Sequence, residues 1–145
     1  MKIYLDVCCL NRPLDDQTQD RIHLESEAII AILKHIELKD WVWISSSVVL
    51  FEINQTPNPD RKYRLLRICD QASQIVRLDE KIYTTAEKLK GIGFKSYDAL
   101  HLACAQRANV DVFLSTDDKL IKKATAKNLI SVKVANPLAW LQEII

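Results

Sequence analysis

KSYDALHLACAQRANVDVFLSTDDKL, residues 95–120, carries the patterns of a helix, a strand and a second helix in close succession. Apolar residues at helical spacing predict a helix over residues 97–105, for which Ser96 can serve as the N-cap. The short apolar run at 112–115 predicts a buried strand, and residues 119–127 predict a basic helix. A strand between two helices, without a tight hairpin signal, is typical of a parallel sheet.

The same alternation continues toward both ends of the chain. Further buried strands are predicted at residues 3–7, 41–44, 75–78 and 132–134. Helices are predicted at residues 18–38, 48–53, 60–72 and 79–90, with a short helix at the C-terminus. The length of 145 residues is close to the usual size of about 150 residues for one domain. We therefore expect a single domain over residues 1–145, with an α/β fold whose central parallel sheet is flanked by helices on both faces.

The composition is that of an ordinary globular protein and excludes wholesale disorder, with 48% apolar and 27% charged residues. The net charge of +1 points to no particular partner. The longest uncharged stretch, residues 41–51, is shorter than the roughly 20 residues that span a bilayer. The N-terminus, MKIYLD, reaches an aspartate after three apolar residues, so it lacks the core of a signal peptide. We expect a cytoplasmic protein that is not associated with a membrane.

The four cysteines show neither CxxC spacing nor a cluster with histidine; they are Cys8, Cys9, Cys69 and Cys104. Free cysteine commonly behaves as a small core residue. We therefore expect reduced, buried thiols rather than a zinc site or a disulfide framework.

Four acidic residues fall where the chain is predicted to return to one edge of the sheet. Asp6 ends the first strand, and Glu52 lies in the helix after the second strand. Asp98 is in the first turn of the helix at 97–105, and Asp117 comes just after the next strand. Ligand sites in open α/β sheets lie beyond the carboxyl ends of the strands. Taken singly, each acid also has an ordinary explanation as a cap, a helix-dipole partner or a surface residue.

Four carboxylates gathered at one point would repel one another and raise one another's pKa unless a cation neutralised them. An all-oxygen set of ligands suits hard divalent ions such as Mg²⁺ or Mn²⁺. Such ions can activate water and stabilise the entering and leaving oxygens of phosphodiester cleavage. An acidic cluster without a catalytic Cys, Ser or Gly-rich loop favours this mechanism.

Four segments resemble, in order, successive signatures of the PIN-domain family. They are MKIYLDVCCLNRP at 1–13, SSSVVLFEI at 45–53, KSYDALHLACA at 95–105 and VDVFLSTDDKL at 110–120. No single motif is specific, but the ordered set is stronger and spans nearly the whole chain. The resemblance implies a PIN-like three-layer sandwich and a Mg²⁺- or Mn²⁺-dependent ribonuclease. It also implies that Asp6, Glu52, Asp98 and Asp117 bind the metal and activate the attacking water.

One position departs from the family pattern. The family often places Ser, Thr or Asn two residues after the first aspartate, and here Cys8 stands there. Cysteine is a poor hydrogen-bonding replacement, so Asn11 or a hydroxyl from elsewhere would have to serve. Ser115 or Thr116 could supply a hydroxyl that orients a carboxylate.

Three other features have weaker or divided interpretations. His101, three residues after Asp98, is expected to have a structural role. Asp118 is either a fifth contributor to the acidic cluster or, as we favour, a solvated acid at the start of a helix. Arg12 could contact a phosphate near the metal. The basic residues form two clusters, which are either solvated helix faces or a track for an RNA backbone. The clusters are Arg61, Lys62, Arg64 and Arg67, and Lys119, Lys122, Lys123, Lys127 and Lys133.

The favoured hypothesis is an endoribonuclease that hydrolyses RNA phosphodiester bonds. A single-domain PIN chain of this size resembles a VapC-type toxin of a bacterial type II toxin–antitoxin pair. That resemblance implies a homodimer and a cognate antitoxin whose C-terminal segment occupies the groove. The helix at 18–38 could be the dimer face or could simply cover the sheet. The alternatives are a catalytically weak PIN-like module that binds RNA or protein, and a small-molecule phosphohydrolase; DNA also remains open as a substrate.

Overall fold

The central element of the protein is a parallel sheet, seen in a computed structural model that describes residues 1–126 and 130–145. Within these residues the strand order is β3-β2-β1-β4-β5, and every neighbouring pair is parallel. The strands are β1 (Lys2–Leu5), β2 (Val42–Ser46), β3 (Gln74–Val76), β4 (Val112–Leu114) and β5 (Lys133–Ala135). The predicted α/β fold with a parallel sheet is confirmed.

Strand β1 lies in the middle of the sheet. Ile3 pairs with Trp43 on one side and with Val112 on the other, and Leu5 pairs with Leu114. All five side chains are almost completely buried. The end of β1, where Asp6 follows, is therefore fixed between two neighbouring strands.

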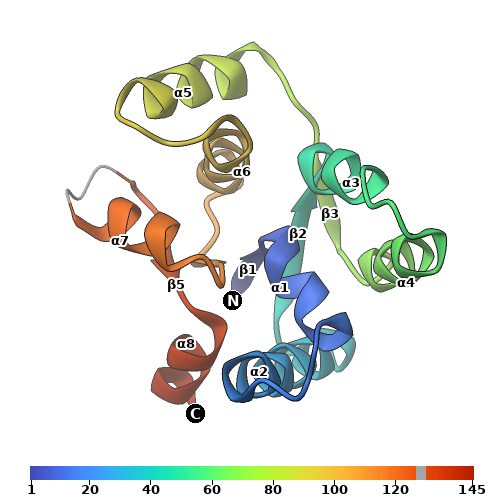
Figure 1. The fold of residues 1–145 in the computed structure, drawn as a ribbon. Coiled ribbons are helices and arrows are strands. Elements are labelled where there is room, and N and C mark those ends of the chain that lie inside the picture. Colours follow the sequence, from blue (N-terminus) through green and yellow to red (C-terminus); the bar gives the residue numbers. More distant parts are fainter. Residues whose placement is uncertain (127–129) are drawn as a thin grey trace.

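Helices cover both faces of the sheet and give the expected three layers. The helices are α1 (Val7–Asn11), α2 (Asp20–Glu37), α3 (Ser47–Asn54), α4 (Pro59–Cys69), α5 (Glu80–Gly91), α6 (Ser96–Arg107), α7 (Asp118–Ala126) and α8 (Pro137–Ile144), with a 3₁₀ turn η1 (Arg12–Leu14). Figure 1 shows α2 and α8 together on one side and α5 and α6 together on the other. In the described part of the chain, no helix combines the length and apolarity needed to cross a bilayer.

The apolar face of helix α2 is buried inside the protein. Ala28, Ile29, Ile32 and Ile36 are buried, and α2 packs against α8. The apolar face of α2 is thus part of the core, and the dimer role considered for residues 18–38 stays a prediction.

Helix starts in this protein are fixed by short polar side chains. Ser46 accepts a hydrogen bond from the amide of Val49 at the start of α3, as the serine run predicts. The expected cap at Ser96 is wrong by one residue. Lys95 takes the extended N-cap conformation without a side-chain hydrogen bond, so Ser96 is already the first helical residue of α6.

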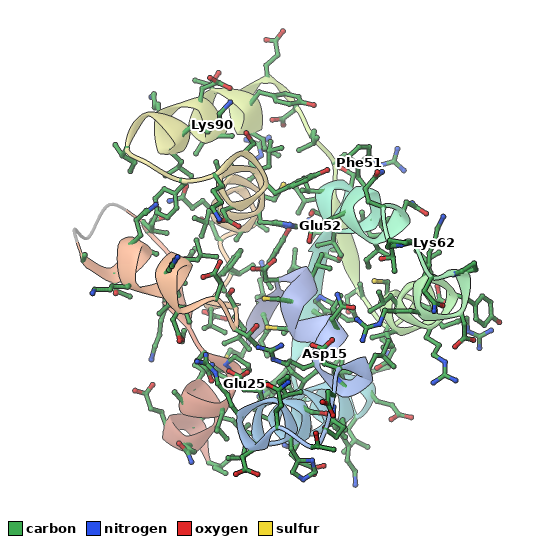
Figure 2. The ribbon with its side chains drawn as sticks, viewed as in Figure 1. Asp15, Glu25, Phe51, Glu52, Lys62 and Lys90 are labelled. Atoms are coloured by element: carbon green, nitrogen blue, oxygen red, sulfur yellow. The ribbon has the colours of Figure 1, made fainter. Side chains whose placement is uncertain are left out.

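The buried carboxylate of Glu25 links three elements: η1, α2 and the start of α8. Glu25 on α2 is 1% exposed and accepts hydrogen bonds from Nε of Arg12 at 2.8 Å and Nε of Arg21 at 3.3 Å. It also accepts one from the side-chain amide of Asn136, whose carbonyl oxygen caps α8 through the amide of Leu138. Figure 2 shows Glu25 between α2 and the region of α8. Arg12 also pairs with Asp15, so its guanidinium has a structural role. The phosphate contact that the sequence allowed for Arg12 stays a prediction.

All four cysteines are free thiols, and three of them are buried, as expected. Burial raises the pKa of Cys69 to about 12 and that of Cys104 to about 11. Both thiols are therefore protonated and unreactive at neutral pH.

Candidate metal centre

One cavity of about 440 Å³ brings together the four acids that the sequence singles out. It is lined by Asp6, Glu52, Asp98 and Asp117, with Cys8, Lys95, Ser96 and Tyr97. The acids come from the end of β1, from α3, from the first turn of α6 and from the segment between β4 and α7. The cavity lies beyond the carboxyl end of the central strand, which is the usual place for a site in such a sheet.

Asp6 is the most firmly held of the four acids. It is 7% exposed, and its Oδ1 accepts a hydrogen bond from the amide of Val7 at 2.8 Å. Its Oδ2 accepts one from the hydroxyl of Ser115 at 2.9 Å. This carboxylate caps α1, so the first strand ends at Leu5. Val7, which was expected to be in the strand, is the first residue of α1.

Asp117 is fixed by the start of the next helix. Its Oδ1 accepts hydrogen bonds from the amides of Lys119 at 3.0 Å and Leu120 at 3.3 Å. Its own amide donates to the hydroxyl of Ser115 at 3.1 Å, so this fully buried serine links Asp117 to Asp6. Asp118 does not line the cavity and pairs with Arg21 at 2.7 Å, as expected for a solvated acid.

Asp98 lies close enough to Asp6 and Asp117 for their charges to affect its carboxyl group. Burial raises the pKa of its carboxyl group, and the nearby charges of Asp6 and Asp117 raise it further. The charged form is therefore disfavoured until a cation compensates the repulsion.

Glu52 is joined to a buried histidine. Nε2 of His101 lies 2.9 Å from Oε1 of Glu52 and 3.9 Å from Oδ1 of Asp6. One potential ligand atom from each of these three residues falls within 4.8 Å of the other two. Figure 2 shows Glu52 on α3, in the direction of α1 and α6.

His101 is the site residue that sequence reasoning missed. Its side chain is 1% exposed, as expected for a histidine with a structural role, but it also contacts the site residue Glu52. Burial lowers its pKa, but the hydrogen bond with Glu52 and the charge of Asp6 outweigh burial, so the net direction is upward. The available signal was its spacing of three residues from Asp98, which places both side chains on one face of α6.

The set of donors fits a hard divalent cation. The four carboxylates could supply oxygen ligands. The carboxylate of Asp6 is already oriented by the hydroxyl of Ser115, and that of Asp117 by the amides of Lys119 and Leu120. A bound Mg²⁺ or Mn²⁺ would relieve the repulsion that Asp6 and Asp117 exert on Asp98.

The hydroxyl that Cys8 cannot provide comes from Ser115. Sγ of Cys8 lies 3.4 Å from that hydroxyl and accepts a hydrogen bond from the amide of Thr116. Asn11 faces elsewhere, donating to the carbonyl of Val7 and accepting from Arg61.

We expect Ser115→Ala to weaken Mn²⁺ binding about 10- to 100-fold, because the orientation of Asp6 and the segment before α7 both depend on this hydroxyl. Cys8→Ser, at the adjacent position, should change the Kd only a few-fold. Mn²⁺ titrations of the two variants check this. Equal losses in both would contradict the assignment of the hydroxyl to Ser115.

The first basic cluster is largely neutralised within the protein. Arg61 pairs with Asp15, Arg64 with Asp60, and Arg67 approaches an aspartate at 4.0 Å. In the second cluster Lys133 pairs with Glu143 and Lys123 donates to a backbone carbonyl, whereas Lys119 and Lys122 are exposed. Lys127 lies outside the described residues. These contacts favour the interpretation of both clusters as solvated helix faces.

The protein combines a parallel sheet, flanked by helices, with four carboxylates that line one cavity beyond the central strands. It is an α/β protein with an acidic centre suited to a divalent cation. The family model described as PIN domain matches residues 3–126, and the chain belongs to the PIN-domain family. Members of this family are generally nucleases. No curated protein matches the chain.

Three solved structures share the fold over 94% of this chain and 98% of their own. VapBC2 from Rickettsia felis, bound to a DNA fragment from the promoter, has 15% identity and a TM-score of 0.61. VapBC-1 from nontypeable Haemophilus influenzae has 11% identity and a TM-score of 0.60. DNA-bound VapBC from Salmonella typhimurium has 11% identity and a TM-score of 0.57.

Proposed function

We propose that the protein is a Mg²⁺- or Mn²⁺-dependent endoribonuclease that hydrolyses RNA phosphodiester bonds. The observation that carries this proposal is the meeting of Asp6, Glu52, Asp98 and Asp117 in one cavity of a PIN-domain chain. These four residues would hold the metal. When bound there, the cation supplies Lewis acidity at the phosphate and lowers the pKa of the attacking water.

The protein's own residues contribute orientation. Ser115 fixes Asp6 relative to Asp117, and His101 holds Glu52, so the carboxylates need little rearrangement before the reaction. Water attacks the phosphorus, and an oxygen of the ribose leaves, which cuts the chain at one phosphodiester. The acids would hold the cation and position the water; none of them forms a bond to phosphorus.

The shape of the surface favours a polymeric substrate over a small phosphate ester. The acidic cavity continues over Cys8 and Glu52 into a groove of about 530 Å³. Thr56 and Asn58 line this groove and offer polar groups. A strand with its scissile phosphate at the acids has room there for neighbouring nucleotides.

We further propose that residues 1–145 act as one domain and as the toxin of a type II toxin–antitoxin pair in the cytoplasm. The support is the family match together with the likeness to VapBC structures over nearly the whole chain. A cognate antitoxin would occupy the groove beside the acids and block metal or substrate. A neighbouring reading frame that encodes a short DNA-binding protein would support this part of the proposal.

The toxin proposal includes a homodimer, and an exposed apolar surface beside the acidic cavity suits its interface. A groove between α3, α5 and α6 is lined by Phe51, Tyr83 and Tyr97, which are 56%, 51% and 40% exposed. Figure 2 labels Phe51 beside Glu52 on α3, so a second copy seated here would lie near the acidic cavity. The dimer is a proposal that sedimentation of the purified protein can test.

Incubation of the purified protein with end-labelled single-stranded RNA and Mn²⁺ tests the main proposal. Internal cleavage that stops with EDTA and in Asp6→Asn is expected. A matched single-stranded DNA separates RNA specificity from general phosphodiesterase activity. Salt-dependent RNA binding without cleavage would favour the catalytically weak binding module, and cleavage that ignored EDTA would exclude the metal mechanism.

We expect Mn²⁺ to stabilise the protein against heat. A ligand present at 100 times its Kd adds about 2.7 kcal/mol of stability. For a chain of this size that corresponds to a rise in Tm of about 5–10 °C. Calorimetry with Mn²⁺ and then with excess EDTA checks the rise and its reversal. Asp117→Asn, in which a carboxylate of the cavity is lost, should show a much smaller rise, and an equal rise would place the bound ion elsewhere.

A further inference from the structure

A chain of buried polar groups leads from the interior of the sheet to the acidic cavity. The hydroxyl of Tyr4, on β1, lies 2.7 Å from Oγ of Ser46 and 2.7 Å from Nδ1 of His101. The other ring nitrogen of His101 then reaches Glu52 at 2.9 Å. Tyr4, Ser46 and His101 are each at most 1% exposed, so water does not compete for these contacts.

The partners determine where the hydrogens lie. A carboxylate only accepts hydrogen bonds, so Nε2 of His101 must carry the proton that points to Glu52. With a neutral ring, Nδ1 accepts from Tyr4, whose oxygen in turn accepts from Ser46. With a charged ring, both bonds of Tyr4 reverse, yet the proton on Nε2 stays.

We propose that His101 is a positioning residue for the metal centre: its Nε2–H holds Oε1 of Glu52 and leaves the other carboxylate oxygen for the cation. This inference rests on the proposed function and deepens it. The ring is held in turn by Tyr4, which fixes its orientation about the side-chain bonds. The same N–H lies 3.9 Å from Oδ1 of Asp6, so it also reduces repulsion between Asp6 and Glu52.

The alternative role for His101 is direct coordination, because its ring and the two carboxylates are close enough to share an ion. Both ring nitrogens already have partners, Tyr4 and Glu52. Coordination through Nε2 would require loss of its proton and of the bond to Glu52. The geometry therefore favours the positioning role.

Mn²⁺ binding to variants at position 101 tests the proposal without RNA. His101→Leu is expected to weaken Mn²⁺ binding about 10- to 100-fold, the usual effect of losing a partner of a metal ligand. His101→Gln keeps an N–H donor at similar reach and should restore affinity to within a few-fold. Leu102→Ala, at a fully buried neighbour on α6, controls for destabilisation alone and should leave the Kd unchanged.

Electron paramagnetic resonance of free Mn²⁺ gives the affinities, and thermal melts show that each variant is folded. Unchanged binding in His101→Leu would overturn the proposal. Loss of binding in both His101 variants, with both folded, would overturn it in favour of direct coordination.

A second measurement does not depend on metal binding. ¹⁵N-detected NMR of the metal-free protein should show the proton on Nε2 of His101, whether the ring is neutral or charged. A neutral ring protonated on Nδ1 alone would overturn the proposal. If the wild type bound no Mn²⁺ while NMR showed the Nε2 proton, the proposed function would fail and the contact with Glu52 would stand.

Discussion

Asp98→Asn is expected to reduce RNA cleavage by more than about 100-fold. The loss of a residue that only contacts a metal ligand already lowers metal affinity or activity about 10- to 100-fold, and Asp98 is a proposed ligand itself. The fold should survive. Burial and the charges of Asp6 and Asp117 already disfavour the charged carboxylate in the metal-free protein. Removing that charge relieves repulsion, so the Tm without metal should stay the same or rise. Cleavage of labelled RNA and melting by circular dichroism measure the two effects.

Asp118→Asn is the matched control for this variant. Asp118 is an exposed aspartate next to Asp117, but it pairs with Arg21 and does not line the cavity. Its substitution should leave cleavage within about two-fold, since surface ion pairs contribute little. Equal activity in Asp98→Asn and the wild type would remove the acids from the mechanism. A collapsed Tm in Asp98→Asn would contradict the like-charge repulsion.

Glu25→Ala should have the largest effect on stability. Removing one partner of a buried ion pair costs about 3–5 kcal/mol, because the remaining charge stays buried without compensation. Here Arg12 would lose its buried partner and keep only Asp15, and the amide of Asn136 would lose its acceptor beside the cap of α8. The loss should therefore lie near the lower end of that range. The Tm should fall by about 10 °C. Urea unfolding of the metal-free protein gives the free energy directly.

Glu27→Gln, at an exposed glutamate on the same helix, is the control for the loss of a negative charge on α2. It should change stability by less than about 0.5 kcal/mol. A similar loss in both variants would mean that the charge of the helix, not the buried network, sets the stability. Glu25→Gln should fall between the two, because its amide carbonyl can still accept a hydrogen bond.

The elements and the meeting of the acids could be predicted because both follow from local patterns. Buried strands alternate with amphipathic helices, and a parallel sheet brings the ends of its strands to one edge. The sequence therefore placed Asp6 and Asp117 correctly at neighbouring strand ends, and the structure gathers them with Asp98 at one cavity. Their role as metal ligands stays a prediction.

Contacts between distant side chains could not be predicted from the same patterns. The role of His101 depends on its contacts with Tyr4 and Glu52, which lie 97 and 49 positions away in the chain. Arg12 could have faced a phosphate, and only the packing of η1 against α2 directs it to Glu25. Strand β1 ends at Leu5 and not at Val7 because the carboxylate of Asp6 caps α1, a detail of side-chain geometry that hydrophobic periodicity does not contain.

The hydroxyl of Ser115 has a consequence for biosynthesis. It joins Asp6 to the segment before α7 although Ser115 and Asp6 are 109 positions apart. During translation β1 cannot pair with β4 until β4 has been synthesised. The long-range pairing of these two strands, which completes the acidic centre, therefore forms late. A nascent chain that ends before this serine lacks both the hydroxyl and Asp117, and it should emerge from the ribosome harmless to RNA.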